Sequence, residues 1–482
     1  MTSPNPTDRQ EPEQPTRAEA LWFGFRALCF RARRGVENLK GTAPRRLALH
    51  PAEAAGKMIA ESRASLFASV NPAEFALQAG KVHNLRLAAR AVDGVRLKAG
   101  ETFSFWAQVG RPIRRRGFVA GRELREGCII PSIGGGLCQL SNSLYDAALS
   151  ANFEIVERHA HSQRIPGSMS VTGRDATVFW NYVDLRFRAG FDWQIEARLT
   201  ASELIVRIHQ LSNRRLSVAP SLPSDDEDRE EAESCETCGV TSCFRNSAAA
   251  NLEKRGHTAW LVDAWQPEHD RYLTENRSAE DWLFTPLHSE RWGIGPYRWS
   301  SAGFARVAEC PLFVARRSWK SRRLAAQGSA RQRTLLALDE ELALSFARRL
   351  SPLAHHVVVS QNLLPFLWRN GVLGGRTFDV LITRLPLGDL ESVLDRAATA
   401  HPESHTLADF RAPVEIVTAE RLALAEARRW ISPHRGIARL AGDRAELLDW
   451  HVPKRPAAVR GDTIVFPAST LGRKGAYELR DA

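Results

Sequence analysis

The sequence has no run of about 20 apolar residues, the length that an α-helix needs to cross a bilayer. This absence predicts that the chain has no transmembrane helix. The usual order of a secretion signal is missing too, because the arginine-rich segment 31–34 follows the apolar patch Leu21–Phe30 instead of preceding it. We therefore expect a cytoplasmic protein. Weak contact with a membrane surface through an amphipathic helix at 19–32 stays open as an alternative.

Lysine is scarce, and most of the 66 basic residues are arginines. With 55 acidic residues the net charge is +11, and it is spread along the whole chain. Such a charge permits contact with anionic partners but identifies none of them. We find no specific nucleic-acid-binding motif, so small molecules and glycans are the substrate classes left open.

The composition of the 482 residues is that of a globular protein, since 44% are hydrophobic and 25% are charged. Disorder and fibrous repeats are therefore excluded for the bulk of the chain. At about 100–200 residues per domain, the length predicts two to four globular units. Shifts in composition predict a disordered tail at 1–18, a helical segment at 19–92, an α+β domain at 93–212, an acidic linker and cysteine-rich segment at 213–250, an α/β domain at 251–455, and the start of a second lobe at 456–482.

The hydrophobic periodicity differs between the two large domains. Before residue 212, short strands surround one helix; the expected strands are Glu101–Val109, Glu154–Ile165, Ala176–Phe187, Trp193–Leu199 and Leu204–Gln210. After residue 250, buried strands alternate with helices; the expected elements are strands at Thr258–Val262, Val357–Ser360 and Asp379–Thr383 and helices at Leu335–Leu350 and Ala419–Arg429. The first pattern predicts an α+β fold, and the second predicts a doubly wound, Rossmann-like parallel sheet.

The most specific stretch of the sequence is IGGGLCQ at Ile133–Gln139. Three consecutive glycines permit positive φ angles and direct backbone N–H groups toward one point. Leu137, Leu140 and Leu144 then recur at helical spacing, which places Cys138 on the first turn of a helix. The helix dipole and the free N–H groups at that position favour a thiolate.

Two histidines and an aspartate complete a candidate catalytic set with Cys138. His159 and His161 lie in a strand-like run and are predicted to share one face. Asp175 follows in a turn. Nucleophilic thiol catalysis uses these residue types, with His161, or less favourably His159, as the general base and Asp175 to hold its tautomer.

The same candidate set includes a site for a developing oxyanion. Either the amides of the glycine loop or the side chain of Gln139 would supply its hydrogen-bond donors. Two other interpretations of Cys138 stay open from the sequence. It is either a small packing residue or, with the histidines, a metal ligand.

Cys235, Cys238 and Cys243 form the densest cluster among the seven cysteines. They offer three soft ligands, whereas a structural zinc ion or an iron–sulfur cluster needs four. His257 and Cys310 are the candidates for the fourth ligand. Structural zinc, an iron–sulfur cluster and unliganded thiols are the three alternatives for this segment.

Four motifs in order carry a resemblance to a known family. They are ETFSFWAQV at Glu101–Val109, IGGGLCQLSNSLYDAAL at Ile133–Leu149, ERHAHS at Glu157–Ser162, and GRDATV with the later DLRF between Gly173 and Phe187. Together they make residues 95–190 resemble the VanW family. The resemblance implies a link to the cell envelope or to surface polymers but no established biochemical activity. The order of Cys, His and Asp is also similar to that of transglutaminase-like thiol enzymes, by analogy.

The segment from residue 251 onward resembles the first lobe of a glycosyltransferase built from two Rossmann-like lobes. The stretches that carry this resemblance are VVVSQNLLPFLW at Val357–Trp368, DVLITRLPL at Asp379–Leu387 and ARRWISPH at Ala427–His434. After Thr463 the sequence is similar to the start of the donor lobe, in which Arg473 and Lys474 would bind the diphosphate of a sugar donor. Because the rest of that lobe is missing, we expect sugar recognition rather than sugar transfer; a plain α/β interaction domain is the alternative.

Overall fold

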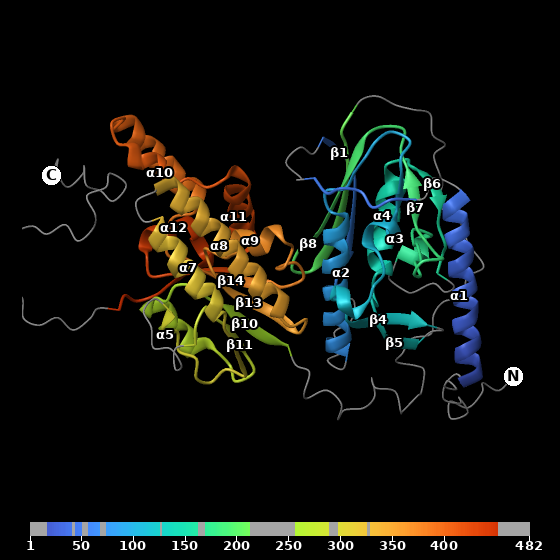
Figure 1. Ribbon diagram of the computed structural model, residues 1–482, viewed down its shortest axis with the longest axis horizontal. Coiled ribbons are helices and arrows are strands. Elements are labelled where there is room, and N and C mark those ends of the chain that lie inside the picture. Colours follow the sequence, from blue (N-terminus) through green and yellow to red (C-terminus); the bar gives the residue numbers. More distant parts are fainter. Residues whose placement is uncertain are drawn as a thin grey trace, which may run out of the picture. The chain divides into compact units, whose positions relative to one another are not determined.

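The structure is a computed structural model that forms two compact units, Met1–Gly256 and His257–Ala482, each treated separately below (Figure 1). The residues that it describes are 17–40, 44–50, 56–67, 74–125, 128–161, 169–212, 256–288, 297–324 and 328–451. The predicted tail, the acidic and cysteine-rich linker and the predicted second lobe lie outside these ranges, apart from the tail's last two residues. None of the helices in the described ranges combines the length and the hydropathy that crossing a membrane requires.

The first unit is built on a four-stranded antiparallel sheet. Its strands, in spatial order, are β1 (Lys57–Ser65), β9 (Glu203–Gln210), β8 (Trp193–Leu199) and β2 (Arg96–Leu97). The predicted pair at 193–199 and 204–210 is present as β8 and β9. Trp193, Ile195 and Val206 are fully buried, and their neighbours Gln194 and Ile205 on the opposite face are buried too. Both faces of this strand pair are therefore covered at these positions.

Strand β1 corrects the predicted helical segment at 19–92. Residues 57–65 are composed mostly of good helix formers, yet they pair with β9, from Lys57 opposite Gln210 to Ser65 opposite Glu203. Pairing with a strand more than a hundred residues away overrides local propensity, which is a weak preference. Residue 92 is therefore not a boundary between compact units, because β1 shares its core with the domain that follows.

Two helices pack against this sheet. Helix α2 (Phe75–Val92) contacts β8, and α4 (Cys138–Ser150) contacts β1 and β9. Their buried leucines, among them Leu85, Leu140 and Leu144, join Trp193 of the sheet in one core. Helix α1 (Arg17–Lys40) lies apart from this core, beside β6 and β7 (Figure 1).

The remaining strands of the first unit form one small sheet and one hairpin, and the hairpin was not predicted. They are β3 (Thr102–Ser104), β7 (Arg186–Arg188) and β6 (Glu154–Glu157) in one small sheet, and β4 (Ala120–Arg125) with β5 (Cys128–Ile133) in a hairpin. Short helices α3 (Phe105–Val109), η4 (Arg114–Arg116) and η5 (Met169–Thr172) connect them. The predicted strands at 101–109, 154–165 and 176–187 thus each keep only a few residues in β structure, because side chains such as Asp184 occupy the backbone donors instead.

The second unit holds a seven-stranded, fully parallel sheet. Its order is β12 (Arg306–Ala308), β11 (Trp282–Phe284), β10 (His257–Leu261), β13 (Ala354–Ser360), β14 (Thr377–Leu381), β15 (Arg429–Ser432) and β16 (Ala445–Leu447). The first strand along the chain, β10, is therefore central. Strands β11 and β12 extend the sheet to one edge, and β13 to β16 extend it on the other side of β10. This order is compatible with the predicted doubly wound, Rossmann-like fold.

Helices cover both faces of the parallel sheet. They are α5 (Pro267–Asn276), α7 (Pro311–Arg323), α8 (Gly328–Arg349), α9 (Leu364–Arg369), α10 (Leu387–Ala400), α11 (Val414–Glu426) and α12 (Arg435–Ala441), with short turns η8 (His405–Ala408) and η9 (Gly442–Arg444). Val357 and Val359 pack into one core with α8 and α9, while Val358 joins Tyr272 of α5 in a second core. Burial on both faces explains the near-continuous apolar runs of these strands.

The sequence pattern missed four strands of the second unit, β11, β12, β15 and β16. Arg429, expected as the last residue of the helix at 419–429, instead begins β15, which pairs with β14. Helix α11 ends earlier, at Glu426. The apolar run is too short for its period to separate a strand from a helix end.

Candidate functional site

The glycine loop before α4 has the backbone conformation that the sequence predicted. Gly134 and Gly136 have φ angles of 82° and 96°, a region that only glycine adopts at little cost. Gly135 is required for another reason, because a Cβ atom there would lie 2.4 Å from the carbonyl oxygen of Gly121. The loop therefore delivers the chain directly into α4, whose first residue is Cys138.

Cys138 is half-buried at the start of α4. Its Sγ atom lies 4.0 Å from the carbonyl oxygen of Val178, and the side chain packs at the margin of the core. No side chain of the described residues caps this helix end, and the N–H groups of Gln139, Leu140 and Ser141 in its first turn donate to the carbonyl oxygens of Gly136 and Leu137. The position thus combines partial access with the positive end of a helix dipole.

His161 and Asp175 meet at this thiol. The Nδ1 atom of His161 lies 2.7 Å from Oδ2 of Asp175, and the backbone N–H of His161 donates to the same oxygen at 2.8 Å. The Cys138 side chain also acts on His161, because it raises the pKa of the imidazole through hydrogen bonding and charge. The structure therefore brings Cys138, His161 and Asp175 together in a line, with the histidine in the centre.

The electrostatics of this line favour a charged imidazole. Burial of the His161 ring is the largest single influence on its pKa and acts to lower it. Hydrogen bonds to Asp175 and Cys138, together with the electrostatic attraction of both groups, act in the opposite direction and raise the pKa to about 9. His161 is thus held as an imidazolium through the neutral pH range.

His159 is not part of this line, which corrects the prediction that both histidines share one face. Strand β6 ends at Glu157, so the alternation of a strand does not extend to residues 159 and 161. The His159 side chain is 49% exposed, and its Nε2 atom lies 3.4 Å from Glu157 Oε1. Its backbone carbonyl accepts a hydrogen bond from Thr177.

Gln139 is also engaged elsewhere. Its side-chain Nε2 donates to the carbonyl oxygen of Ser65 at 2.7 Å, so this amide group is committed to β1 and does not serve as a ready oxyanion donor. The second source considered from the sequence was the backbone of the glycine loop. In that loop Gly135 donates to Ser132 and Gly134 to Val119, and in the first turn of α4 the amides of Gln139, Leu140 and Ser141 donate to Gly136 and Leu137, so none of these five amides is a free donor.

Three further residues position Asp175, and sequence reasoning assigned none of them this role. Arg158 donates to the Asp175 carboxylate at 3.0 Å and to its backbone carbonyl at 2.8 Å. From α4, Asn142 Oδ1 accepts from the Ala176 amide at 2.8 Å and Ser141 Oγ donates to the Ala176 carbonyl at 2.6 Å. All three residues lie within the motifs of the sequence analysis. Their closeness to Cys138 and His161 in the sequence could have predicted this role.

The predicted metal ligands and the predicted diphosphate-binding residues are not part of this site. Cys235, Cys238 and Cys243, and likewise Arg473 and Lys474, fall outside the described residues. The proposed partners of the cysteine cluster have other contacts: His257 stacks on Trp282, and Cys310 accepts from Arg349. Over the ranges that the structure describes, no three His, Cys, Asp or Glu side chains come together in an arrangement that would hold a metal ion.

The second unit has a crevice of about 490 Å³ at the carboxyl ends of β14 and β15. It is lined by Thr383, Arg384, Leu385, His434, Arg435, Gly436, Ile437 and Trp450. Arg384 is held in place by the buried carboxylate of Glu420 at 2.9 Å. The Trp450 ring is 54% exposed and meets His434 edge to face at 4.8 Å.

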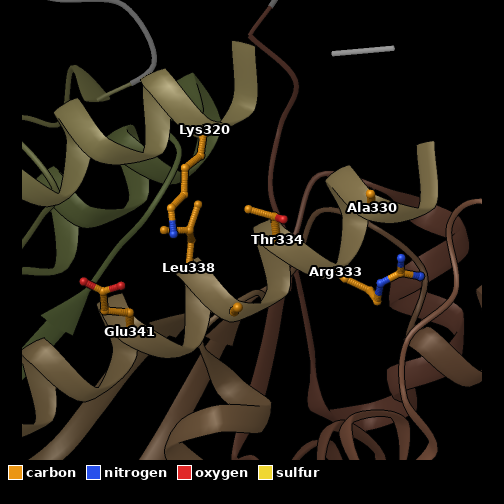
Figure 2. A pocket seen from close by; sticks show the side chains of 7 residues that line it. Lys320, Ala330, Arg333, Thr334, Leu338 and Glu341 are labelled. Atoms are coloured by element: carbon orange, nitrogen blue, oxygen red, sulfur yellow. The ribbon is translucent and has the colours of Figure 1, made fainter. Parts of the chain in front are cut away.

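A second hollow of about 370 Å³ lies between α7 and α8. Figure 2 shows Lys320 of α7 reaching toward Leu338 of α8, with Arg333 and Glu341 at opposite ends. Glu341 is paired with Arg316. This hollow has no exposed aromatic ring and carries a carboxylate, so it is a poorer match than the crevice for a sugar or an anion.

The comparison with protein families matches part of the first unit. A family model described as "VanW like protein" matches residues 80–209. The uncharacterized protein YoaR of Bacillus subtilis (strain 168) is 34% identical over 146 residues, which are 30% of this chain and 48% of that protein. The vancomycin B-type resistance protein VanW of Enterococcus faecalis (strain ATCC 700802 / V583) is 34% identical over 136 residues, which are 27% of this chain and 50% of that protein.

The chain spans about half the length of these curated relatives. No solved structure matches the chain. The family model ends before the second unit begins, and the predicted resemblance of that unit to a glycosyltransferase finds no support in these comparisons. The match does cover all of Cys138, His161 and Asp175, so the candidate site lies within a VanW-like domain at residues 80–209.

Proposed function

We propose that the VanW-like domain performs thiol-dependent acyl or amide chemistry with Cys138 as the nucleophile. The observation that carries this proposal is the line of Cys138, His161 and buried Asp175, with His161 hydrogen-bonded on both sides. A packing cysteine has no need of an imidazolium beside it. In the alternative function, a binding or scaffold domain, the same residues would only stabilise the fold.

The chemistry follows from these positions. The Cys138 thiolate attacks the carbonyl carbon of an ester or amide, and a C–S bond forms. The backbone N–H of Cys138 is the proposed donor to the developing oxyanion. As the tetrahedral intermediate collapses, the C–O or C–N bond breaks and the leaving alcohol or amine takes the proton of His161. Water or an amine then attacks the thioester, gives its proton to His161 and releases the thiolate.

The link to the cell envelope or to surface polymers rests on the relatives. One of them bears a name that associates it with vancomycin resistance, and the relatives match only part of their own length. The envelope substrate is therefore proposed as a class, an ester or amide of an envelope polymer or its precursor.

The thiol chemistry is tested with p-nitrophenyl acetate. We expect the full chain to release a burst of about one equivalent of p-nitrophenolate and to gain one acetyl group on Cys138, read by peptide mass spectrometry. His161→Gln should slow the burst at least about tenfold, because the thiolate loses its counter-ion. The exposed thiol of Cys29 serves as the internal control.

Two outcomes of this experiment would contradict the proposal. Acetylation of Cys138 no faster than that of Cys29 would mean that the site does not activate its thiol. An unchanged burst in Cys138→Ser would place the reaction on another residue. Either result would favour a binding or scaffold role for the domain.

For the second unit, we propose recognition of a sugar that carries an anionic group. The supporting observation is the crevice with an exposed Trp450 ring and two arginines, Arg384 and Arg435. Aromatic rings bind the apolar faces of sugars, and arginine forms paired hydrogen bonds with phosphate or carboxylate. The crevice lies at the carboxyl edge of an open parallel sheet, where such folds bind their ligands.

Saturation-transfer NMR with N-acetylglucosamine 1-phosphate tests this second proposal. We expect saturation transfer to the sugar protons, and at least about a fivefold decrease in affinity for Trp450→Ala or Arg435→Ala. Arg333→Ala, in the hollow between α7 and α8, is the matched control and should leave binding unchanged. Absence of transfer, or equal losses in all three variants, would remove the sugar-recognition role.

A further inference from the structure

Helix α1 is attached to the first unit by one of its faces. Arg34 forms a two-pronged ion pair with Glu157 and also donates to the carbonyl of Tyr182. One turn earlier, Phe30 stacks on the Tyr182 ring at 5.6 Å, and Arg31 donates to the carbonyl of Trp180. These contacts fix which side of α1 points toward the domain and which side points away.

The side that points away is apolar. Leu21, Phe25 and Leu28 are spaced at i, i+4 and i+7 and so lie on one stripe, and they are 75%, 56% and 61% exposed. Trp22, at the edge of the stripe, is 61% exposed and stacks on Phe25. Soluble surfaces carry single exposed apolar residues, but a continuous stripe of large side chains indicates an interaction surface.

The charges around this stripe have one sign. Arg26 and Arg33 are seven residues apart and exposed along one border of the stripe, whereas Arg31 on the other side donates to Trp180 of the domain. No acidic residue occurs anywhere between Glu19 and Glu37. A second copy of α1 placed against the first would bring these arginines close to one another, so like charges disfavour self-association through this face.

We propose that α1 holds the first unit on the surface of an anionic lipid bilayer. The stripe of Leu21, Trp22, Phe25 and Leu28 enters the boundary between headgroups and acyl chains, and the bordering arginines contact lipid phosphates. The helix lies in the plane of the surface and does not cross the membrane. This inference stands apart from the proposed thiol chemistry, because none of the residues that carry it touches Cys138, His161 or Asp175.

Vesicle flotation of the full chain tests the inference, with phosphatidylcholine vesicles compared with vesicles that contain 30% phosphatidylglycerol. We expect at least about tenfold tighter binding to the anionic vesicles. The double variant Leu21→Gln/Phe25→Gln should lose at least about tenfold of that binding, and Arg26→Gln about fivefold. Leu312→Gln alters a side chain that is 88% exposed on α7 and is the matched control, with binding unchanged.

Several results would overturn this inference. They are no binding to either kind of vesicle, equal binding to both kinds, and unchanged binding of the double variant. Light scattering of the eluted protein provides one more decisive result. A dimer that the double variant abolishes, without any vesicle binding, would assign the stripe to a second copy of the chain instead of a membrane.

Discussion

Replacing His161 with glutamine is expected to slow the alkylation of Cys138 by iodoacetamide about a hundredfold at pH 6.5. The wild-type imidazole carries a pKa raised to about 9, so it stays protonated across neutral pH, and the proposed mechanism pairs it with the Cys138 sulfur as a thiolate. Without it, the thiol has the titration of an ordinary cysteine near about pH 8.5, and about one in a hundred molecules is ionised at pH 6.5.

The raised pKa of His161 also predicts how the alkylation rate of Cys138 depends on pH. A raised pKa means that the imidazolium is fully present below the ordinary value near 6.5 and is lost as the pH rises through about 9. Wild-type alkylation should therefore be fast and nearly constant between pH 6 and 8. In His161→Gln the rate should rise about tenfold per pH unit over the same range.

Two matched variants separate this mechanism from a general change in the domain. His159→Gln alters a half-exposed ring that pairs with Glu157 and should keep the wild-type profile. Asp175→Asn removes the carboxylate that holds His161 and should slow alkylation nearly as much as His161→Gln. If all three variants and the wild type follow the ordinary thiol titration, Cys138 is not an activated nucleophile.

Replacing Asp184 with alanine is expected to destabilise the first unit by about 3–4 kcal/mol. Its side chain is buried and accepts four hydrogen bonds. One oxygen accepts from the backbone N–H groups of Trp106 at 3.1 Å and Leu185 at 3.0 Å, and the other from Ser104 Oγ at 2.6 Å and Arg186 Nε at 2.8 Å. Removing the carboxylate leaves these buried donors, one of them charged, without their acceptor.

Hydrogen exchange in increasing urea measures this loss within the first unit, on peptides that cover α2 and β8–β9. Glu203→Ala is the control, since Glu203 forms only a surface pair with Arg63 and should cost less than about 1 kcal/mol. Asp184→Asn keeps the shape of the side chain but loses the charge. Its loss of unfolding free energy should fall between those of Asp184→Ala and Glu203→Ala. A loss below about 1 kcal/mol for Asp184→Ala would mean that its donors find other partners.

The local features of the candidate site could be predicted from the sequence. The glycine run, the helix that starts at Cys138 and the strand pair at 193–210 follow from short-range rules for φ angles, helix periodicity and strand alternation. The alternation of strands and helices after residue 250 likewise predicts a parallel sheet. Each of these features depends on residues that are close together in the chain, so the pattern itself contains the information.

Only the tertiary structure decided which histidine reaches Cys138. The sequence favours His161 over His159 only slightly, and the end of β6 at Glu157 together with the Asp175 carboxylate selects His161. The same holds for β1, whose residues become a strand through pairing with β9, and for Gln139, which Ser65 draws away from the thiol. These outcomes depend on contacts between distant segments, and such contacts form only when the chain has folded.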